Sequence, residues 1–200
     1  MSGLPPPTCE VDQWVVAEAA KRQRTGETVN ALLVGIGQDE QALRLAETGA
    51  RVLLLSDREP FGHVNVVQSP VAHLFQADAE FPLQPFDLIV CQRALCSLRY
   101  TEARATIRNL LGRLKIGGRF YVSLYGIHSE LGEQYADGGK LVNERHCPLT
   151  PALAERYKLP GPVCLYSERN LFSLLMEAGG AVLKTSTSAL GHVRGVAARI

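Results

Sequence analysis

The sequence predicts a single α/β domain, residues 1–200, built on a doubly wound, mostly parallel sheet. Short apolar runs alternate with segments whose apolar residues recur at helical spacing, the pattern of strands joined by helical crossovers. The first crossover, over residues 31–57, has a glycine turn between an apolar run and a helix. No internal repeat or low-complexity tract interrupts the 200 residues, a length that one domain can form.

The first half of the chain is expected to begin with a helix over residues 9–24, with Val11, Val15 and Ala19 turned inward. Residues 1–8 include three consecutive prolines and are expected to be disordered. The further elements expected here are a strand over residues 31–34, a helix that ends at Gly49, a strand over residues 52–55 and a strand-like stretch, Val64-Asn65-Val66-Val67.

The second half shows its clearest helix over residues 101–114, whose apolar residues share one face and which Gly117-Gly118 is expected to end. Ser167 has the position of an N-cap for a later helix with an apolar face. The strands expected here cover residues 86–90, 119–124, 181–186 and 192–198.

Residues 126–165 break this alternation and are expected to form an insertion after the fifth strand. The segment has four prolines, five glycines and no sustained apolar period, and it contains His128 and His146. Long irregular segments in compact domains are frequently lids or binding loops, and this one leaves the edge where open α/β sheets bind ligands. We therefore expect a lid, with either histidine as a candidate base; the alternative is a loop that packs on its own tyrosines.

The glycine turn and a later acid indicate a nucleotide-like ligand. Gly35 and Gly37 follow the first apolar run and Asp57 follows the second, at the spacing where an acid binds a ribose. Glu40 takes the place of the third glycine of a dinucleotide pattern, beside Asp39. Two carboxylates at a helix N-terminus disfavour a pyrophosphate but are tolerable beside a cationic sulfonium. Asp39 is also expected to be the N-cap of this helix.

Five sequence motifs follow one another along the chain at regular spacing. They are Val34-Gly35-Ile36-Gly37, Ser56-Asp57-Arg58-Glu59-Pro60, Gln76-Ala77-Asp78-Ala79-Glu80, Phe86-Asp87-Leu88-Ile89-Val90 with Ala94-Leu95-Cys96-Ser97-Leu98, and Leu114-Lys115-Ile116-Gly117-Gly118-Arg119-Phe120. In this order they resemble the motifs of the class I S-adenosylmethionine (SAM)-dependent methyltransferases. The resemblance runs from about residue 31 to the C-terminus and rests on the order of the motifs, since no single one is specific.

The resemblance implies a Rossmann-like methyltransferase fold of seven strands with an antiparallel last strand, SAM as the cofactor and a small molecule as the methyl acceptor. Asp57 would bind the ribose hydroxyls and Asp78 would face the adenine amino group. The residues assigned to the cofactor are Gly35, Ile36, Gly37, Asp57, Arg58, Asp78, Ala79 and Gln92. No metal site is expected. No catalytic residue is assigned, because methyl transfer from a sulfonium needs alignment more than an acid or a base.

Departures from the family pattern keep two alternatives open. Leu33 stands where the family usually has an acid, Asp39 where it has the third glycine, and Ile116 where it has a proline. Residues 60–71 are also short for the helix that usually separates the second and third strands. These departures motivate a catalytically silent relative that serves as a binding or interaction module. An NAD-type Rossmann oxidoreductase is disfavoured by the missing glycine and the acid pair.

The composition favours a cytoplasmic protein without a nucleic-acid or membrane partner. The formal net charge is +1, and the basic cluster Lys21-Arg22-Gln23-Arg24 is interpreted as a solvated helix face. No apolar run approaches the roughly 20 residues that a membrane span requires. The five cysteines form no C-x-x-C pair and no signal sequence is present, so we expect reduced thiols. The oligomeric state does not follow from the sequence.

Overall fold

The computed structural model describes residues 10–35, 37–59, 62–76 and 80–200. The expectation for residues 1–8 therefore lies outside the described residues. The strands are β1 (Asn30–Gly35), β2 (Arg51–Leu55), β3 (Val66–Ser69), β4 (Phe86–Gln92), β5 (Leu114–Leu124), β6 (Cys147–Pro148), β7 (Pro162–Val163), β8 (Ala181–Thr187) and β9 (Val193–Ala198). The α-helices are α1 (Glu10–Arg24), α2 (Gln38–Glu47), α3 (Tyr100–Gly112), α4 (Pro151–Tyr157) and α5 (Glu168–Glu177). Short 3₁₀ helices are η1 (Val71–Phe75), η2 (Glu130–Gly132) and η3 (Val142–Glu144).

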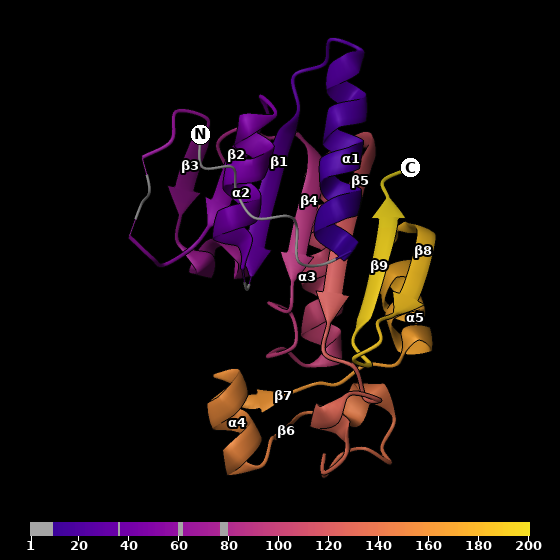
Figure 1. The fold of residues 1–200 in the computed structure, drawn as a ribbon. Coiled ribbons are helices and arrows are strands. Elements are labelled where there is room, and N and C mark those ends of the chain that lie inside the picture. The colour runs from indigo at the N-terminus through magenta and orange to yellow at the C-terminus, as the bar shows by residue number, and fades with distance from the viewer. Residues whose placement is uncertain (1–9, 36, 60–61, 77–79) are drawn as a thin grey trace.

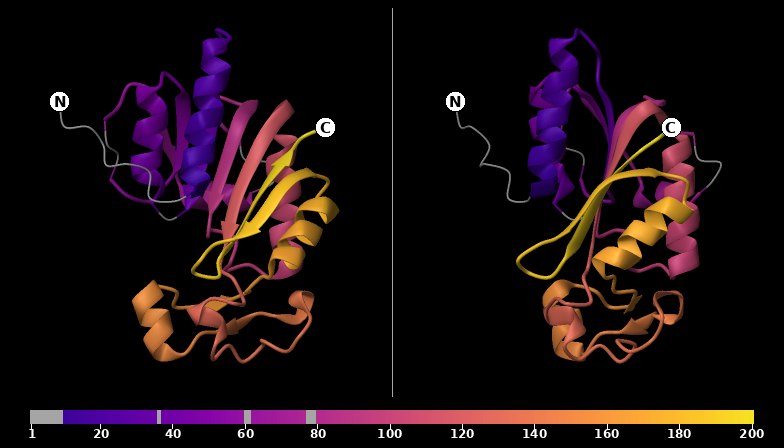
Figure 2. Two further views of the ribbon diagram at one scale, coloured as in Figure 1. Left: turned by 45° about the vertical axis from the view of Figure 1, so that its right-hand side comes forward. Right: turned by 90° about the vertical axis from the view of Figure 1, so that its right-hand side faces the viewer.

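One seven-stranded sheet, ordered β3-β2-β1-β4-β5-β9-β8, forms the centre of the fold (Figure 1). The strands from β3 to β5 in this order pair in parallel, whereas β9 is antiparallel to both of its neighbours, β5 and β8. Helices α1 and α2 lie on one face, and α3 and α5 lie on the other (Figure 2). The predicted doubly wound, mostly parallel sheet with an antiparallel last strand is confirmed.

The central strands are apolar along their whole length because both faces of the sheet are covered. Along β1, Leu32 and Val34 enter the apolar layer under α3 and α5. The alternate residues Ala31 and Leu33 enter the layer under α1 and α2. The inward residues predicted for the first helix, among them Val15, are buried in this second layer.

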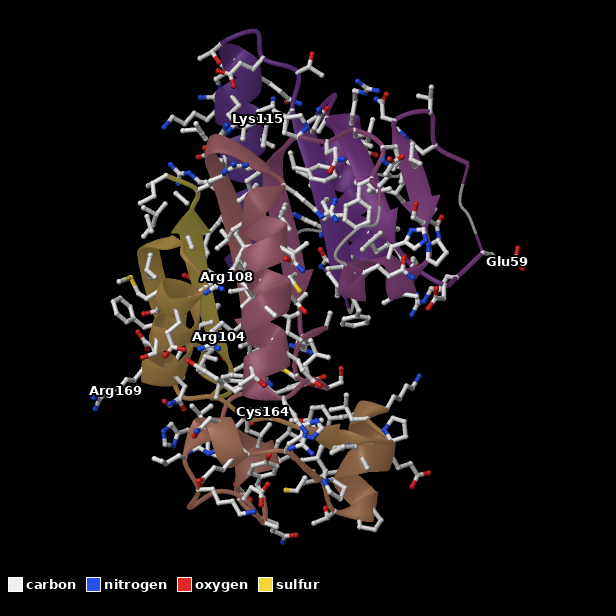
Figure 3. All side chains as sticks on the ribbon, turned by 180° about the vertical axis from the view of Figure 1, so that it is seen from behind. Glu59, Arg104, Arg108, Lys115, Cys164 and Arg169 are labelled. Carbon is white, nitrogen blue, oxygen red and sulfur yellow. The ribbon has the colours of Figure 1, made fainter. Side chains whose placement is uncertain are left out.

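Polar contacts at the surface attach α5 to α3. Arg104 Nη1 lies 3.1 Å from Glu177 Oε2, and Arg108 Nη2 donates to the Glu177 backbone oxygen at 2.9 Å. Both arginines lie on the side of α3 that faces α5 (Figure 3). These contacts satisfy the C-terminal end of α5, where backbone carbonyls lack helical partners.

The fifth strand is longer than predicted, because the two glycines expected to end the preceding helix lie within the strand. Helix α3 ends at Gly112 and β5 already begins at Leu114. Gly117 has a φ of +75° and donates its N–H to the Arg199 oxygen at 2.8 Å. The pairing of β4 with β5 shifts register between Phe86 and Leu88. The glycines thus allow an irregularity in β5, and their prediction as a helix stop is wrong.

Two residues were predicted to be helix N-caps, and one of the two predictions is confirmed. Ser167 Oγ accepts a hydrogen bond from the Asn170 N–H at 3.2 Å, and the predicted N-cap is confirmed. The prediction that Asp39 caps α2 is wrong, because Gly37 is the N-cap, in the left-handed conformation and without a side-chain cap. Only the second half of the strand-like stretch Val64–Val67 lies in β3, which runs from Val66 to Ser69, and no helix separates β2 from β3 among the described residues between them.

Residues 126–165 form a separate layer beyond the carboxyl edge of the parallel strands (Figures 1 and 2). The two ends of the segment are joined, since the Ile127 N–H donates to the Tyr166 oxygen at 2.9 Å. The Cys164 N–H donates to the Cys96 oxygen at 2.8 Å, where the segment meets the loop after β4. Cys164 marks this junction in Figure 3. Backbone hydrogen bonds therefore attach the segment to the sheet at its ends.

Gly35→Ala is expected to lower the free energy of unfolding by about 2 kcal/mol or more, because an overpacked contact and a strained backbone each cost about 1–3 kcal/mol. Gly35 has a φ of +116°, and a Cβ there would lie 1.9 Å from the Gln92 carbonyl oxygen. Urea denaturation measures the change. The control is Gly139→Ala, whose Cβ would meet nothing within 4 Å. Equal stability of the two variants would contradict the importance of this close approach.

Candidate active site

The carboxyl ends of four adjacent parallel strands meet at one edge of the sheet and line a cavity of about 710 Å³. Gly35 ends β1 and Leu55 ends β2, while Arg93 and Tyr125 directly follow β4 and β5. Residues 156–158, at the end of α4, line the cavity from the segment 126–165. This volume falls within the range of about 300–1,000 Å³ in which small-molecule sites are found.

The glycine turn forms one wall of the cavity. Its two described positions require glycine for different physical reasons. Gly35 is required by the protein itself, because a Cβ would collide with the backbone of β4 at Gln92. A Cβ on Gly37 would meet nothing within 4 Å, so the space beside Gly37 is open toward the cavity. The sequence prediction placed both glycines at the ligand, and both line the cavity. Ile36, the residue between them, lies outside the described residues.

Asp57 lies at the carboxyl end of β2 and lines the same cavity. Its Oδ1 accepts a hydrogen bond from the Val71 N–H at 3.0 Å. Asp57 therefore also caps η1, a structural role that the sequence did not indicate. Its other oxygen, Oδ2, has no hydrogen bond to any residue in the described part of the chain.

The two acids at the start of α2 are both paired with arginines. Arg58 Nη1 lies 2.7 Å from Asp39 Oδ2, and both residues line the cavity. Arg44 Nη2 lies 3.3 Å from Glu40 Oε2. Because these pairs offset the negative charge, the acids oppose a pyrophosphate less strongly than expected from the sequence. The acid pair is therefore a weaker argument against a pyrophosphate than the sequence analysis took it to be.

The remaining predicted cofactor residues are not brought to the cavity among the described residues. The Gln92 side chain is buried, and its Nε2 donates to Asp12 Oδ1 of α1 at 2.6 Å. The backbone carbonyl of Gln92 faces Gly35 instead. Asp78 and Ala79 lie outside the described residues. The cofactor role of Gln92 thus has no support from its side chain.

A second wall consists of aromatic and basic residues that the sequence prediction missed. The Arg93 guanidinium carbon lies 5.3 Å from the centroid of the Tyr125 ring. This ring meets Tyr157 edge to face, with centroids 6.0 Å apart, and Lys158 follows on the chain. Arg93 and Tyr125 could have been found because each directly follows a strand, as Asp57 does. No pattern in the sequence marked Tyr157 or Lys158.

Glu130 fixes the part of this wall that comes from α4. The Tyr157 hydroxyl donates to Glu130 Oε2 at 2.9 Å, and Arg156 forms an ion pair with Glu130 Oε1. These contacts hold the Tyr157 ring in place and offset the charge of Arg156.

The histidine nearest this wall is His192, rather than the two that the sequence singled out. Its ring meets Tyr125 edge to face, with centroids 5.4 Å apart. Burial, and secondarily the charge of Arg93, lower the pKa of His192, so the imidazole is neutral at neutral pH. His128 lines a smaller cavity of about 280 Å³ together with His192. His146 Nε2 lies 2.9 Å from the Ser97 oxygen.

Thiol chemistry finds no support near the cavity. Burial raises the pKa of Cys96 to about 12 and that of Cys164 to about 11, so both remain protonated. Groups of three or more His, Cys, Asp or Glu residues that could hold a metal do not occur in the described part of the chain. None of the described helices is long and apolar enough to cross a membrane.

Comparison with known proteins points to one family. Residues 32–122 match the family model described as a methyltransferase domain, just under half of the chain. No curated protein matches the chain.

Several solved structures share the fold. A SAM-dependent methyltransferase from Mesorhizobium loti is similar with a TM-score of 0.65 at 14% identity, covering 98% of this chain and 100% of that one. The 1,6-didemethyltoxoflavin-N1-methyltransferase of Burkholderia thailandensis, with bound 1,6-didemethyltoxoflavin and S-adenosylhomocysteine (SAH), is similar with a TM-score of 0.60 at 16% identity, covering 94% and 81%. The magnesium protoporphyrin IX methyltransferase of Synechocystis PCC 6803, with bound SAH, is similar with a TM-score of 0.58 at 17% identity, covering 94% and 83%.

The match over residues 32–122 and the sheet topology agree with the family that the sequence motifs resemble. The chain has the fold of SAM-dependent methyltransferases and carries a methyltransferase domain over these residues.

His192→Phe is expected to flatten the dependence of the free energy of unfolding on pH below about 6.5. His192 has a folded pKa below its unfolded value of about 6.5, so the unfolded chain binds more protons and stability falls as pH falls below about 6.5. Phe keeps the ring contact with Tyr125 but cannot titrate. Urea denaturation at several pH values measures this, with exposed His128→Gln as the control. A variant that retains the full pH dependence would contradict the assignment.

Proposed function

We propose that the protein transfers the methyl group of SAM to a small molecule held in the 710 Å³ cavity. The observation that carries the proposal is that one cavity unites the open side of Gly37 with Asp57, the acid at the end of the second strand. These are the two positions that the family motifs assign to the cofactor. The chain would work in the cytoplasm, in agreement with free Cys91, Cys96, Cys147 and Cys164.

The residues present fit an adenosine-containing ligand with a cationic sulfonium. Gly37 leaves room beside the turn, and Asp57 can accept hydrogen bonds from ribose hydroxyls through Oδ2 while Oδ1 binds Val71. SAM supplies an activated methyl group, so the chain has to hold donor and acceptor in line and exclude water. Tyr157, packed on the buried Tyr125 ring, offers an apolar surface for the acceptor on the opposite wall.

The neutral imidazole of His192 could accept a proton from an acceptor hydroxyl or amine. Its Nδ1 is buried and has no hydrogen-bond partner among the described residues. Since His192 lines the adjoining cavity, which shares Tyr157 with the larger one, it would act from the edge of the acceptor site.

The catalytically silent module remains the main alternative, because Asp39 stands at the place of the third glycine and is tied to Arg58. A titration calorimetry experiment with SAM and, separately, with NAD distinguishes the hypotheses. We expect SAM to bind with a dissociation constant in the micromolar range, roughly −8 kcal/mol, and NAD not to bind. A protein that ignores SAM at millimolar concentration would favour the silent module, and selective NAD binding would favour an oxidoreductase.

Asp57→Ala is expected to weaken SAM binding at least about tenfold, the equivalent of 1.4 kcal/mol, because charge-assisted hydrogen bonds to the ribose are lost. The same change should lower the free energy of unfolding by about 1 kcal/mol, since the Val71 N–H loses its acceptor. Asp57→Asn is the matched control, because the amide oxygen can still bind Val71. Calorimetry and urea denaturation measure the two effects. Unchanged affinity with reduced stability would leave Asp57 as a cap alone.

The segment 126–165 is proposed to act as a lid, with most of its movement near α4. Its ends are held by backbone hydrogen bonds, so amide exchange without ligand should be fastest around residues 150–160 and slow in β4 and β5. Hydrogen exchange measured by mass spectrometry, with and without SAH, tests this. Exchange around α4 as slow as in the sheet would contradict a lid.

A further inference from the structure

The acceptor side of the cavity carries positive charge that no carboxylate offsets. Of the four cations that line it, Arg58 is paired with Asp39 and Arg156 with Glu130. Arg93 and Lys158, the other two, form no ion pair within the described part of the chain.

Arg93 and Lys158 are both held in an unusual backbone conformation. Arg93 has a φ of +61° and Lys158 a φ of +55°, whereas residues with a side chain rarely adopt positive φ. Together with Leu83, these are the positive-φ residues other than glycine in the described part of the chain. Lys158 is the C-cap of α4, where helices commonly end in this conformation, whereas Arg93 directly follows a strand, and strained positions of that kind cluster at functional sites. Two of the three positions therefore lie at the cavity.

The neighbouring rings prepare the Arg93 guanidinium to bind a carboxylate. The group lies over the face of Tyr125, 5.3 Å from its centroid. Arg93 also forms a hydrogen bond with the Tyr125 hydroxyl, and because a guanidinium has five N–H donors, others are left to bind a carboxylate through two hydrogen bonds. The positive charge of Arg93 also contributes to lowering the pKa of His192 and opposes the rise in the pKa of Tyr157, so the group lies near both side chains.

The aromatic residues select for a flat molecule. Tyr125 and Tyr157 meet edge to face at 6.0 Å between centroids, and Glu130 holds the Tyr157 hydroxyl. The Tyr125 ring is itself buried, so the pair presents the Tyr157 ring to a ligand, and an aromatic ligand packed on this ring gains affinity beyond that of its buried area. We propose that the methyl acceptor is a planar aromatic acid, with its rings against Tyr157 and its carboxylate bound by Arg93 and Lys158. This proposal rests on the proposed methyl transfer, because it names the acceptor of that reaction.

Arg93 and Lys158 can also bind a different carboxylate, that of the cofactor itself. The variants Lys158→Ala and Arg93→Gln separate the two sources. If the acceptor uses these cations, SAH affinity should change by less than twofold in Lys158→Ala and Arg93→Gln. If the cofactor uses them, SAH affinity should fall at least tenfold, and the proposal is overturned. Lys21→Ala, a lysine on α1 that does not line the cavity, is the control.

The direct test titrates three probes into the full chain, with and without saturating SAH. They are 2-naphthoate, its neutral counterpart 2-naphthamide, and cyclohexanecarboxylate, an acid without an aromatic ring. We expect 2-naphthoate to bind at least tenfold more tightly than either of the others, and this preference to fall at least fivefold in Lys158→Ala and Arg93→Gln. Calorimetry measures the affinities.

The outcomes distinguish this proposal from the proposed function. Equal binding of 2-naphthoate and 2-naphthamide, or no binding of 2-naphthoate by a protein that binds SAH, overturns the aromatic-acid acceptor and leaves methyl transfer standing. A protein that ignores SAH but still selects 2-naphthoate through Lys158 and Arg93 overturns methyl transfer and supports the aromatic-acid site. If 2-naphthoate and cyclohexanecarboxylate both bind more tightly than 2-naphthamide, the aromatic part of the proposal is overturned, and only the carboxylate site stands.

Discussion

The close approach of β1 to β4 is the constraint on which the ligand edge depends. Gly35 pairs with Gln92 across the two strands, and the contact leaves no space for a side chain at Gly35. The Gln92 side chain binds Asp12, so α1 is attached to the same point. The chain then turns at Gly37 into α2. The absence of a Cβ at Gly35 thus allows β1 to approach β4 closely at the point where α1 is attached, just before α2 and the cavity begin.

The two walls of the cavity owe their shape to different forces. The position of the wall at the glycine turn follows from the parallel register of β1, β2 and β4. The opposite wall depends on side-chain contacts across long sequence separations, above all the contacts of Glu130 with Arg156 and Tyr157. We infer that the donor wall is the more rigid of the two, which suits a site that holds one ligand closely and admits a variable second one.

The fold could be predicted largely from the sequence because buried parallel strands require continuous apolar runs and their crossovers require helical periodicity. Asp57 could be placed because it follows a strand. The same rule would have found Arg93, but Gln92, one residue earlier, has its side chain on the other side of β4, since successive side chains in a strand alternate. Lys158 reaches the cavity through the packing of residues 126–165, for which no periodic pattern exists.

The insertion of β9 between β5 and β8 has a consequence for how the chain folds during synthesis. Until residues 193–198 have left the ribosome, β5 lacks the neighbour that pairs with residues Arg119 to Leu124. An unpaired edge in the middle of an apolar sheet is prone to association with other chains. Helix α5 and β8 also lack the strand against which they pack. We therefore expect the right-hand part of the sheet in Figure 1 to form only after residues 193–198 have been translated.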